Sequence, residues 1–266
     1  MITTKSQTLH HQWADYTSIA AEYHIYPNYA DWLVRALGMV VACIQGTRVA
    51  DIGAGSGKLT EMLGELGASG FAIEPNDAMR DEGERLTRAK GFDFTWMKGT
   101  AEDTRLDDAA VDWVCLGSSL HWADTTRALS EARRVLRPGG SISVLWDLRD
   151  EERDPHFRAI EAIIHEIRPG LGRAPTIIRE LMRDLDEVLE RHEFRDCIRL
   201  EAAHRRWYTP EDYVRAWRTV RDLAAQTTKD EYNTIMNRIY DLVKGETMVP
   251  MNMRTFCFTS RIVSRP

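Results

Sequence analysis

The chain has 266 residues, of which 43% are hydrophobic and 29% charged, an ordinary composition for a soluble globular protein. Its formal net charge of −6 argues against a partner bound by phosphate neutralisation, so we expect no nucleic-acid partner. The longest apolar stretch, 32–44, is interrupted by Arg35 and is too short to span a bilayer. No secretory signal is visible, and we expect a cytoplasmic protein without a membrane partner.

The four cysteines are far apart in the sequence, and none belongs to a C-x-x-C pair. This pattern makes structural zinc improbable and favours buried free thiols over two disulfides. The sequence therefore predicts no metal site.

The first half of the chain is predicted to alternate strands and helices. Two helices come first, at 6–23 and 28–44, the second starting at Pro27. Strands are expected at 47–52, 70–74, 92–97, 111–117 and 141–147, and helices at 57–66, 76–89 and 124–136. This alternation is typical of βαβ crossovers and a parallel sheet, in which ligands bind at the carboxyl ends of the strands.

The second half has a different character. Helices are expected at 155–167, 176–192 and 229–244, another starts at Thr209-Pro210, and strands are expected at 196–206 and 254–263. Four segments are expected: N-terminal helices acting as a lid at 1–46, a ligand-binding core at 47–147, a helical cap insertion at 148–192, and sheet-completing strands with cap helices at 193–266.

The segment 49–60, VADIGAGSGKLT, predicts a strand, a glycine loop and a helix. Glycine allows sharp turns and close approach of a ligand to the backbone, and the helix start offers free N–H groups. The spacing G-x-G-x-G differs from the G-x-G-x-x-G of dinucleotide binders, because position 58 is lysine. Asp51, two residues before the first glycine, favours a cationic ligand such as S-adenosylmethionine (SAM). A tight turn without a ligand is the alternative interpretation.

Further motifs follow downstream. Glu74 ends the second predicted strand, where a carboxylate can accept hydrogen bonds from ribose hydroxyls, although a solvated glutamate is equally compatible. The loop 97–103 offers backbone and carboxylate groups to an adenine edge. The strand 111–117 runs into a corner of small residues and then His121-Trp122, and 131–144 predicts a helix stopped at Pro138 and followed by a strand.

In order and spacing, the motifs ADIGAGSG, FAIEPNDAMR, GTAED, VDWVCLGSSLHWAD and RVLRPGGSISVLW resemble a class I SAM-dependent methyltransferase. The resemblance covers about residues 12–146 and is strongest to the small-molecule branch that includes trans-aconitate methyltransferase. It implies a Rossmann-like, doubly wound, mostly parallel seven-stranded sheet with an antiparallel last strand and a helical cap. It implies SAM as cofactor, a small-molecule substrate, and a monomer or homodimer. The implied cofactor-binding set is Tyr23, Asp51, Gly53, Ala54, Gly55, Glu74, Pro75, Met79, Thr100, Ala101, Glu102, Gly117 and Ser118.

His121 is the candidate catalytic base, since it follows the fourth-strand corner; a structural histidine at a helix start is the alternative. Trp122 and Trp146 are candidate walls of the cavity, although buried tryptophans more often belong to the core. His24, like Tyr23, is a candidate to close over the cofactor. The acceptor cannot be named from the sequence.

One departure from the family pattern bears on the reaction. Relatives carry arginine before the proline in a pattern like Y-x-x-x-R-P-x-Y, whereas this chain has Tyr26 before Pro27. If that arginine gathers the carboxylate of SAM, the carboxylate is held differently here. A SAM-using enzyme that does not methylate, such as an intramolecular cyclase forming azetidine-2-carboxylate and methylthioadenosine, is therefore the alternative, and a non-catalytic SAM-binding protein is a third.

Overall fold

The computed structural model describes residues 15–262, and its centre is one seven-stranded sheet. The strand order is β3-β2-β1-β4-β5-β7-β6. The strands are β1 (Arg48–Ile52), β2 (Ser69–Ile73), β3 (Phe94–Met97), β4 (Val111–Gly117), β5 (Leu136–Arg149), β6 (Phe194–Tyr208) and β7 (Val249–Ile262). β1 to β5 pair in parallel, whereas β7 runs antiparallel to both β5 and β6. The predicted fold class is therefore confirmed.

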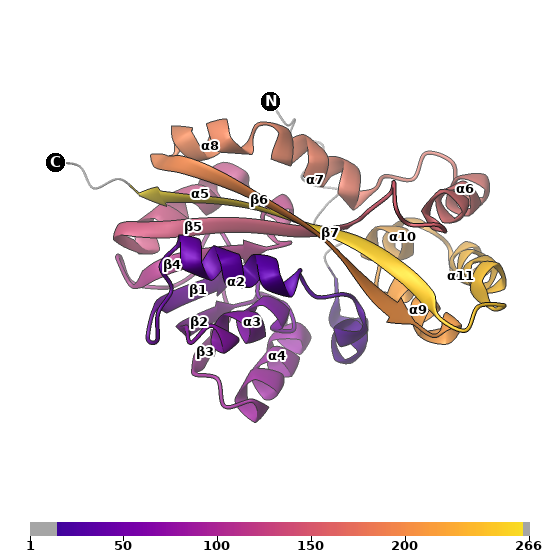
Figure 1. Cartoon of the computed structure of the whole chain (residues 1–266), viewed down its shortest axis with the longest axis horizontal. Coiled ribbons are helices and arrows are strands. Elements are labelled where there is room, and N and C mark those ends of the chain that lie inside the picture. Colours follow the sequence, from indigo (N-terminus) through magenta and orange to yellow (C-terminus); the bar gives the residue numbers. More distant parts are fainter. Residues whose placement is uncertain (1–14, 263–266) are drawn as a thin grey trace.

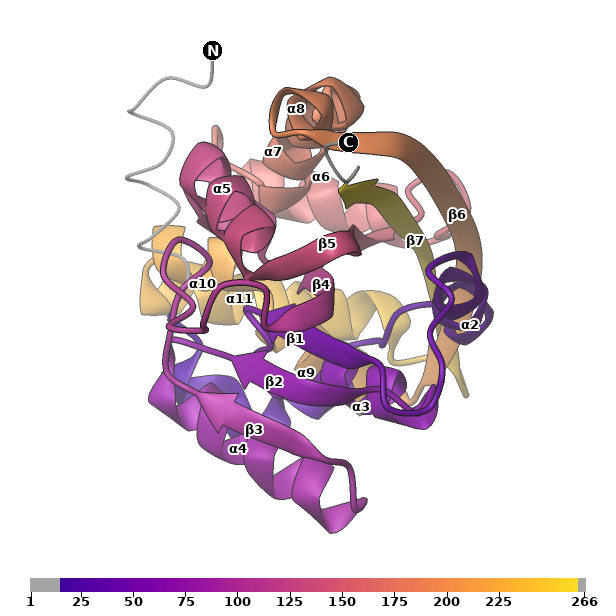
Figure 2. The same cartoon turned by 90° about the vertical axis from the view of Figure 1, so that its left-hand side faces the viewer.

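Helices cover both faces of this sheet, as Figures 1 and 2 show. One face is covered by α2 (Asp31–Val40) and α3 (Lys58–Glu65), whose leucines pack on Val49 and Trp113. The other face is covered by α5 (Thr125–Val135), α7 (Ala174–Arg183) and α8 (Leu185–Arg191), with Leu185 and Leu189 buried against the strands. α4 (Asp77–Ala89) lies beside β3. Because helices cover both faces of the sheet, both sides of the parallel strands are buried, and these strands are nearly continuous hydrophobic runs in the sequence.

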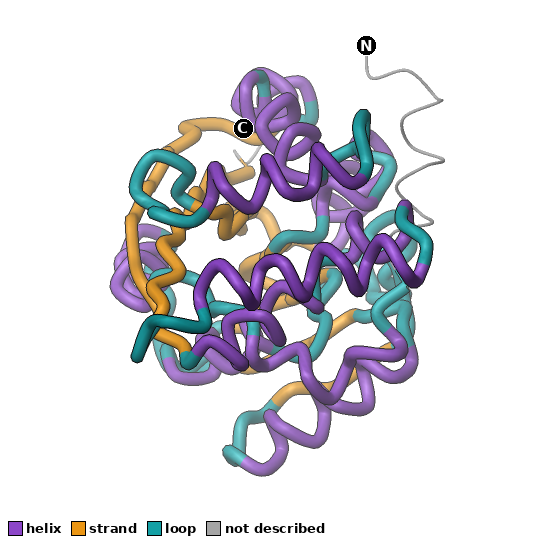
Figure 3. The backbone as a smooth tube through the Cα atoms, turned by 90° about the vertical axis from the view of Figure 1, so that its right-hand side faces the viewer, coloured by secondary structure: helices purple, strands orange, loops and turns teal. Residues whose placement is uncertain are grey.

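A second core lies at the far ends of β6 and β7 (Figure 1). Its helices are α6 (Phe157–Ile167), α9 (Pro210–Arg218), α10 (Arg221–Gln226) and α11 (Lys229–Val243). Figure 3, viewed from this end, shows these helices standing in front of the strands. Trp217 and Tyr213 of α9 are fully buried there. α9 starts as predicted, because the Thr209 side chain accepts a hydrogen bond from the Asp212 N–H and Pro210 follows it.

Several predicted boundaries are wrong, for local physical reasons. The part of the first predicted helix that the structure describes is a 3₁₀ helix, η1 (Thr17–Ile25), and residues 6–14 lie outside the described residues. The next helix begins at Asp31 rather than at Pro27, because the backbone at Tyr26 is extended, as is usual before proline. The helix predicted at 176–192 is broken at Asp184, and β7 begins at Val249, before the predicted position. The short helix η2 (Leu120–Trp122) and α10 were not predicted.

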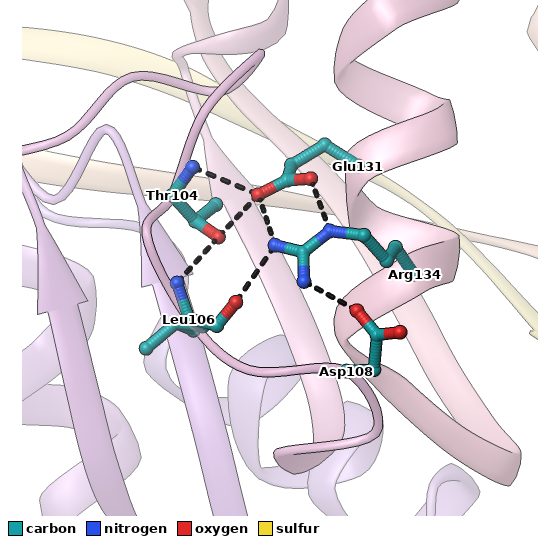
Figure 4. A network of polar contacts seen from close by, with 5 residues as sticks. All are labelled: Thr104, Leu106, Asp108, Glu131 and Arg134. Atoms are coloured by element: carbon teal, nitrogen blue, oxygen red, sulfur yellow. Dashed lines mark hydrogen bonds and ion pairs between the residues drawn. The ribbon is translucent and has the colours of Figure 1, made fainter.

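A polar network ties the loop after β3 to α5 (Figure 4). Glu131 accepts hydrogen bonds from the backbone N–H of Thr104 at 2.9 Å and from Arg134 Nε at 2.8 Å. Arg134 also donates to the Leu106 carbonyl and to Asp108. Burial alone would raise the pKa of Glu131, but the hydrogen bonds from Arg134 and Thr104 hold it at about 2. The network fixes the loop that leads into β4.

Replacement of Glu131 by Gln should lower the free energy of unfolding by about 2 kcal/mol at pH 7, because Arg134 loses its ion pair. The folded-state pKa of Glu131 lies below that of the unfolded chain, so its contribution is complete above about pH 4.5. It declines as the pH falls from there toward 2, and the difference between the two proteins should shrink with it. Urea denaturation at pH 7, 5 and 3 measures this. A pH-independent difference would contradict the account.

Candidate active site

The glycine loop joins β1 to α3 through three residues with positive φ, namely Gly53 at 71°, Gly55 at 58° and Gly57 at 86°. L-residues with side chains rarely adopt this region. At Gly53 a Cβ atom would lie 2.4 Å from Cβ of Ser119, so the loop could not approach the corner after β4. The loop conformation predicted from the glycine spacing is thus required by packing as well as by the turn.

Asp51 is the last acidic residue before the loop, and it is fully buried. Its Oδ2 accepts a hydrogen bond of 2.5 Å from Thr60 Oγ1 in α3. Its Oδ1 has no hydrogen-bond partner among the described residues. Burial raises the pKa of Asp51 to about 7, against the opposing effect of the Thr60 bond. An unsatisfied carboxylate oxygen at this place is suited to a cationic ligand.

Glu74, which follows β2, holds the loop from the other side. Its Oε2 accepts the Gly55 N–H at 2.8 Å, and its Oε1 accepts the Asn76 N–H at 2.9 Å. Burial raises the pKa of Glu74, and these two backbone bonds oppose the shift. Each carboxylate oxygen keeps a second lone pair, so the group can still accept hydrogen bonds from a ligand.

These groups line one cavity of about 320 Å³ at the carboxyl ends of the parallel strands. Every residue of the predicted cofactor set borders it: Tyr23, Asp51, Gly53, Ala54, Gly55, Glu74, Pro75, Met79, Thr100, Ala101, Glu102, Gly117 and Ser118. The unpartnered oxygen of Asp51 and the bare backbone at Gly55, where a Cβ would meet Met79 Cε at 3.4 Å, fit a ligand with a cationic group pressed against the loop.

His121 borders an adjoining cavity instead. Its Nδ1 accepts a hydrogen bond of 3.2 Å from the indole N–H of Trp146, and its ring packs on Trp122 at 4.5 Å between centroids. A neutral imidazole with Nδ1 as acceptor carries its proton on Nε2, which leaves that nitrogen a donor. This bond favours the structural role over the basic one, and the catalytic role of His121 stays a prediction. Trp146 belongs to the core, and His24 borders neither cavity.

The adjoining cavity has a volume of about 390 Å³ and is walled by the C-terminal helices. It shares Tyr16, Tyr23, Tyr26, Ser118, Trp122 and Asp147 with the first cavity. Its wall is rich in charge: Arg149 stacks on the Trp217 ring at 3.9 Å, and Arg173 lies 3.2 Å from Glu161 and 3.4 Å from Asp222. The two cavities together offer a floor for one ligand and a neighbouring chamber for another.

Two charged residues that line the first cavity were missing from the predicted set. Lys58 begins α3 and points its ammonium at the Tyr26 carbonyl, and it lies 5.0 Å from the Tyr23 ring. Asp147 is buried in β5 and borders both cavities. Lys58 follows directly on the glycine motif, and Asp147 ends a predicted strand, so both signals were present. Their roles depend on neighbours from η1, β6 and β7 that the sequence could not bring together.

Comparison with known proteins gives the family. Residues 50–144 match the model of a methyltransferase domain. The match assigns a methyltransferase domain to this part of the chain and supports its place in the class I SAM-dependent methyltransferase superfamily. SAM is the cofactor of this superfamily. Most residues that line the first cavity belong to the matched segment 50–144, and the others lie in or directly beside η1, in the turn after it and at Asp147. The narrower resemblance to trans-aconitate methyltransferase stays a prediction.

The similarity to curated relatives covers about half of this chain. An uncharacterized methyltransferase of Mycobacterium bovis is 41% identical over 125 residues, which are 47% of this chain and 46% of that protein. The chain thus spans about half the length of the curated relatives it matches. Phosphoethanolamine N-methyltransferase 2 of Haemonchus contortus, solved with SAM, has a TM-score of 0.55 at 17% identity, covering 93% of this chain and 57% of its own. The [4+2]-cyclase SpnF has a TM-score of 0.53 at 18% identity, over 88% of this chain and 81% of its own.

Within 15–262, no helix is long and apolar enough to cross a membrane, and no three metal-ligating side chains gather. The four cysteines are free, two of them buried, as the sequence predicted.

Replacement of Glu74 by Ala removes both acceptors from the glycine loop and from any ribose bound there. We expect the affinity for S-adenosylhomocysteine (SAH) to fall about ten- to hundredfold, since charge-assisted hydrogen bonds contribute about 1.5–3 kcal/mol each. Titration calorimetry measures this, with Glu65→Ala, an acid outside the cavity, as the control. Equal affinity of the Glu74 variant and the wild type would place the ribose-binding carboxylate elsewhere.

Proposed function

We propose that this protein binds SAM in the first cavity and transfers its methyl group to a small molecule held in the second. The observation that carries the proposal is the convergence of the predicted cofactor set on one cavity that shares a wall with another. SAM supplies a methyl group already activated by its sulfonium. The protein then has to align the two partners and exclude water, which a pair of adjoining cavities can do.

The size and enclosure of the second cavity support a small acceptor. Its volume is about 390 Å³, in the range of small-ligand sites, and helices α7, α9 and α10 wall it off. The net charge of −6 opposes a nucleic-acid acceptor. A small molecule that enters between the helices and meets the cofactor beside Asp147 fits these observations best.

Lys58 is proposed to receive the carboxylate of SAM, in place of the arginine expected where Tyr26 stands. Its Nζ donates to the carbonyls of Tyr26 and Pro27, the latter at 3.4 Å, and borders the cofactor cavity. Among residues 15–262 it has no carboxylate within ion-pair distance. Burial lowers the pKa of Lys58 to about 7; Arg206 adds to the shift, and Asp147 and Glu61 oppose it. A ligand carboxylate would restore the charge that burial opposes.

Lys58→Met should therefore weaken SAH binding about tenfold, while leaving methylthioadenosine, which lacks the amino-acid group, unaffected. In the wild type, two groups titrate between pH 6 and 8.5: loss of the Lys58 proton near pH 7 should weaken SAH binding, whereas ionisation of Asp51 should strengthen it. The contribution of Lys58 is therefore the difference between the pH profiles of the wild type and of Lys58→Met, which calorimetry at several pH values measures. We expect the ratio of the two affinities for SAH to fall as the pH rises, and a ratio independent of pH would exclude Lys58 as the carboxylate partner.

A SAM-using cyclase is the second candidate. It is favoured by the altered turn at Tyr26, where the arginine of the family pattern is absent. Mass spectrometry of the nucleoside product decides between them: SAH means methyl transfer, and methylthioadenosine means displacement at the γ-carbon of SAM. We expect SAH when a suitable acceptor is present. Azetidine-2-carboxylate and methylthioadenosine formed from SAM alone, faster than in a sample without protein, would establish the cyclase.

The segments flanking the core are proposed to act as lid and cap over these cavities, with 1–46 as the lid and 148–192 and parts of 193–266 as the cap. Tyr16, Tyr23 and Tyr26 of the N-terminal segment border both cavities. Residues of α7 and α10 border the second cavity. α8 packs on the sheet and takes no part. Slower amide exchange at 15–26 on addition of SAH would support the lid, and unchanged exchange would refute it.

A further inference from the structure

Asp147 lies at the junction of the two cavities, and among residues 15–262 it is the one acidic residue that borders both. It lies near the carboxyl end of β5, next to β4 in the sheet, and its side chain is 5% exposed. Glu74 and Asp51, by contrast, border only the first cavity, beside the glycine loop. Asp147 therefore faces the place where an acceptor and a cofactor would meet.

The two oxygens of Asp147 are in different situations. Oδ1 accepts hydrogen bonds from Thr255 Oγ1 at 2.6 Å and from His204 Nε2 at 2.8 Å. Oδ2 is buried and has no hydrogen-bond partner in the described part of the chain. A buried carboxylate oxygen left unpaired costs free energy, and such groups in native proteins usually have a partner in a bound molecule or water.

The surroundings hold Asp147 in place without satisfying its second oxygen. Thr255 of β7 is itself fixed, since its Oγ1 accepts the Ala30 N–H at 2.8 Å. His204 comes from β6, which lies beyond β7 in the sheet. Arg149, two residues further along β5, is turned to Asp154 and to the Trp217 ring. Burial raises the pKa of Asp147, although the bond from His204 opposes this, so the group is a strong acceptor of hydrogen bonds.

We propose that Asp147 Oδ2 binds the acceptor through an N–H or O–H group, so that the acceptor is an amine or an alcohol rather than a carboxylate or a thioether. His204 and Thr255 are positioning residues, because they hold Oδ1 and leave Oδ2 without a hydrogen bond. The aromatic wall formed by Tyr26, Trp122 and Trp217 would pack against the body of the acceptor. This inference rests on the proposed function, since it assigns the acceptor subsite of the same enzyme.

The test uses four ring compounds of similar shape: benzylamine and benzyl alcohol, which carry the donor, and trimethylbenzylammonium and benzyl methyl ether, which lack it. Protein labelled with ¹³C at the aspartate carboxyl carbons is saturated with SAH, and the resonance that disappears in Asp147→Asn is assigned to Asp147. We expect the amine and the alcohol to shift this resonance and the other two to leave it unchanged. Asp147→Asn should bind benzylamine about tenfold more weakly than the wild type.

Asp150→Asn is the matched control, because Asp150 is a buried carboxyl near the end of the same strand, pairs with Arg254 at 2.9 Å, and borders neither cavity. It should bind benzylamine like the wild type. The proposal would be overturned if no compound shifts the Asp147 resonance, or if compounds with and without the donor shift it equally. It would also be overturned if Asp147→Asn loses SAH binding but still binds methylthioadenosine, because Asp147 would then bind the amine of the cofactor. Failure of the wild type to bind SAH would instead refute the proposed function, so the two failures are distinguishable.

Discussion

The parallel run of β1 to β5 is the constraint on which the rest of the structure depends. Parallel strands end at one edge of the sheet, so the segments that follow them must meet there. The glycine loop, Glu74, the 100–102 loop and the corner at Ser118 follow β1 to β4 in this way, and Asp147 lies near the carboxyl end of β5. Residues far apart in sequence thus face one cavity, and the helices on both faces keep the strands in register.

The same edge concentrates charges that the fold does not neutralise. Asp51 and Asp147 each have one buried carboxylate oxygen without a hydrogen bond in the described chain. The ammonium of Lys58 is held by two backbone carbonyls and by aromatic rings rather than by a carboxylate. Such groups cost stability in the free protein, and the two large cores supply the burial that offsets it. We interpret them as sites prepared for ligand groups of complementary polarity.

The sequence predicted the sheet, and the residues it named as a cofactor set border one cavity, because both signals are local. The glycine spacing, the acid after β2 and the apolar runs are each patterns of a few neighbouring residues. The order of strands and helices then determines that these segments lie at the same edge of the sheet. Boundaries at Tyr26-Pro27 and at Asp184 were missed, since tertiary packing decides where those helices start and stop. The pairing of Asp147 with His204 and Thr255 joins three strands, and no spacing in the sequence indicates it. The hydrogen bond that fixes which nitrogen of His121 accepts likewise comes from Trp146 in β5, 25 positions further along the chain.

The central claim is that the glycine loop and its neighbours form a SAM-binding floor, and Gly55 tests it most directly. This residue has a φ of 58° and faces Met79 across the cavity, so a valine there would fill ligand space at a local cost in backbone strain. Titration calorimetry should show one-to-one binding of SAM by the wild type. The Gly55→Val protein, verified as folded by circular dichroism, should bind at least about tenfold more weakly. Equal affinities, or no binding by the wild type, would contradict the account.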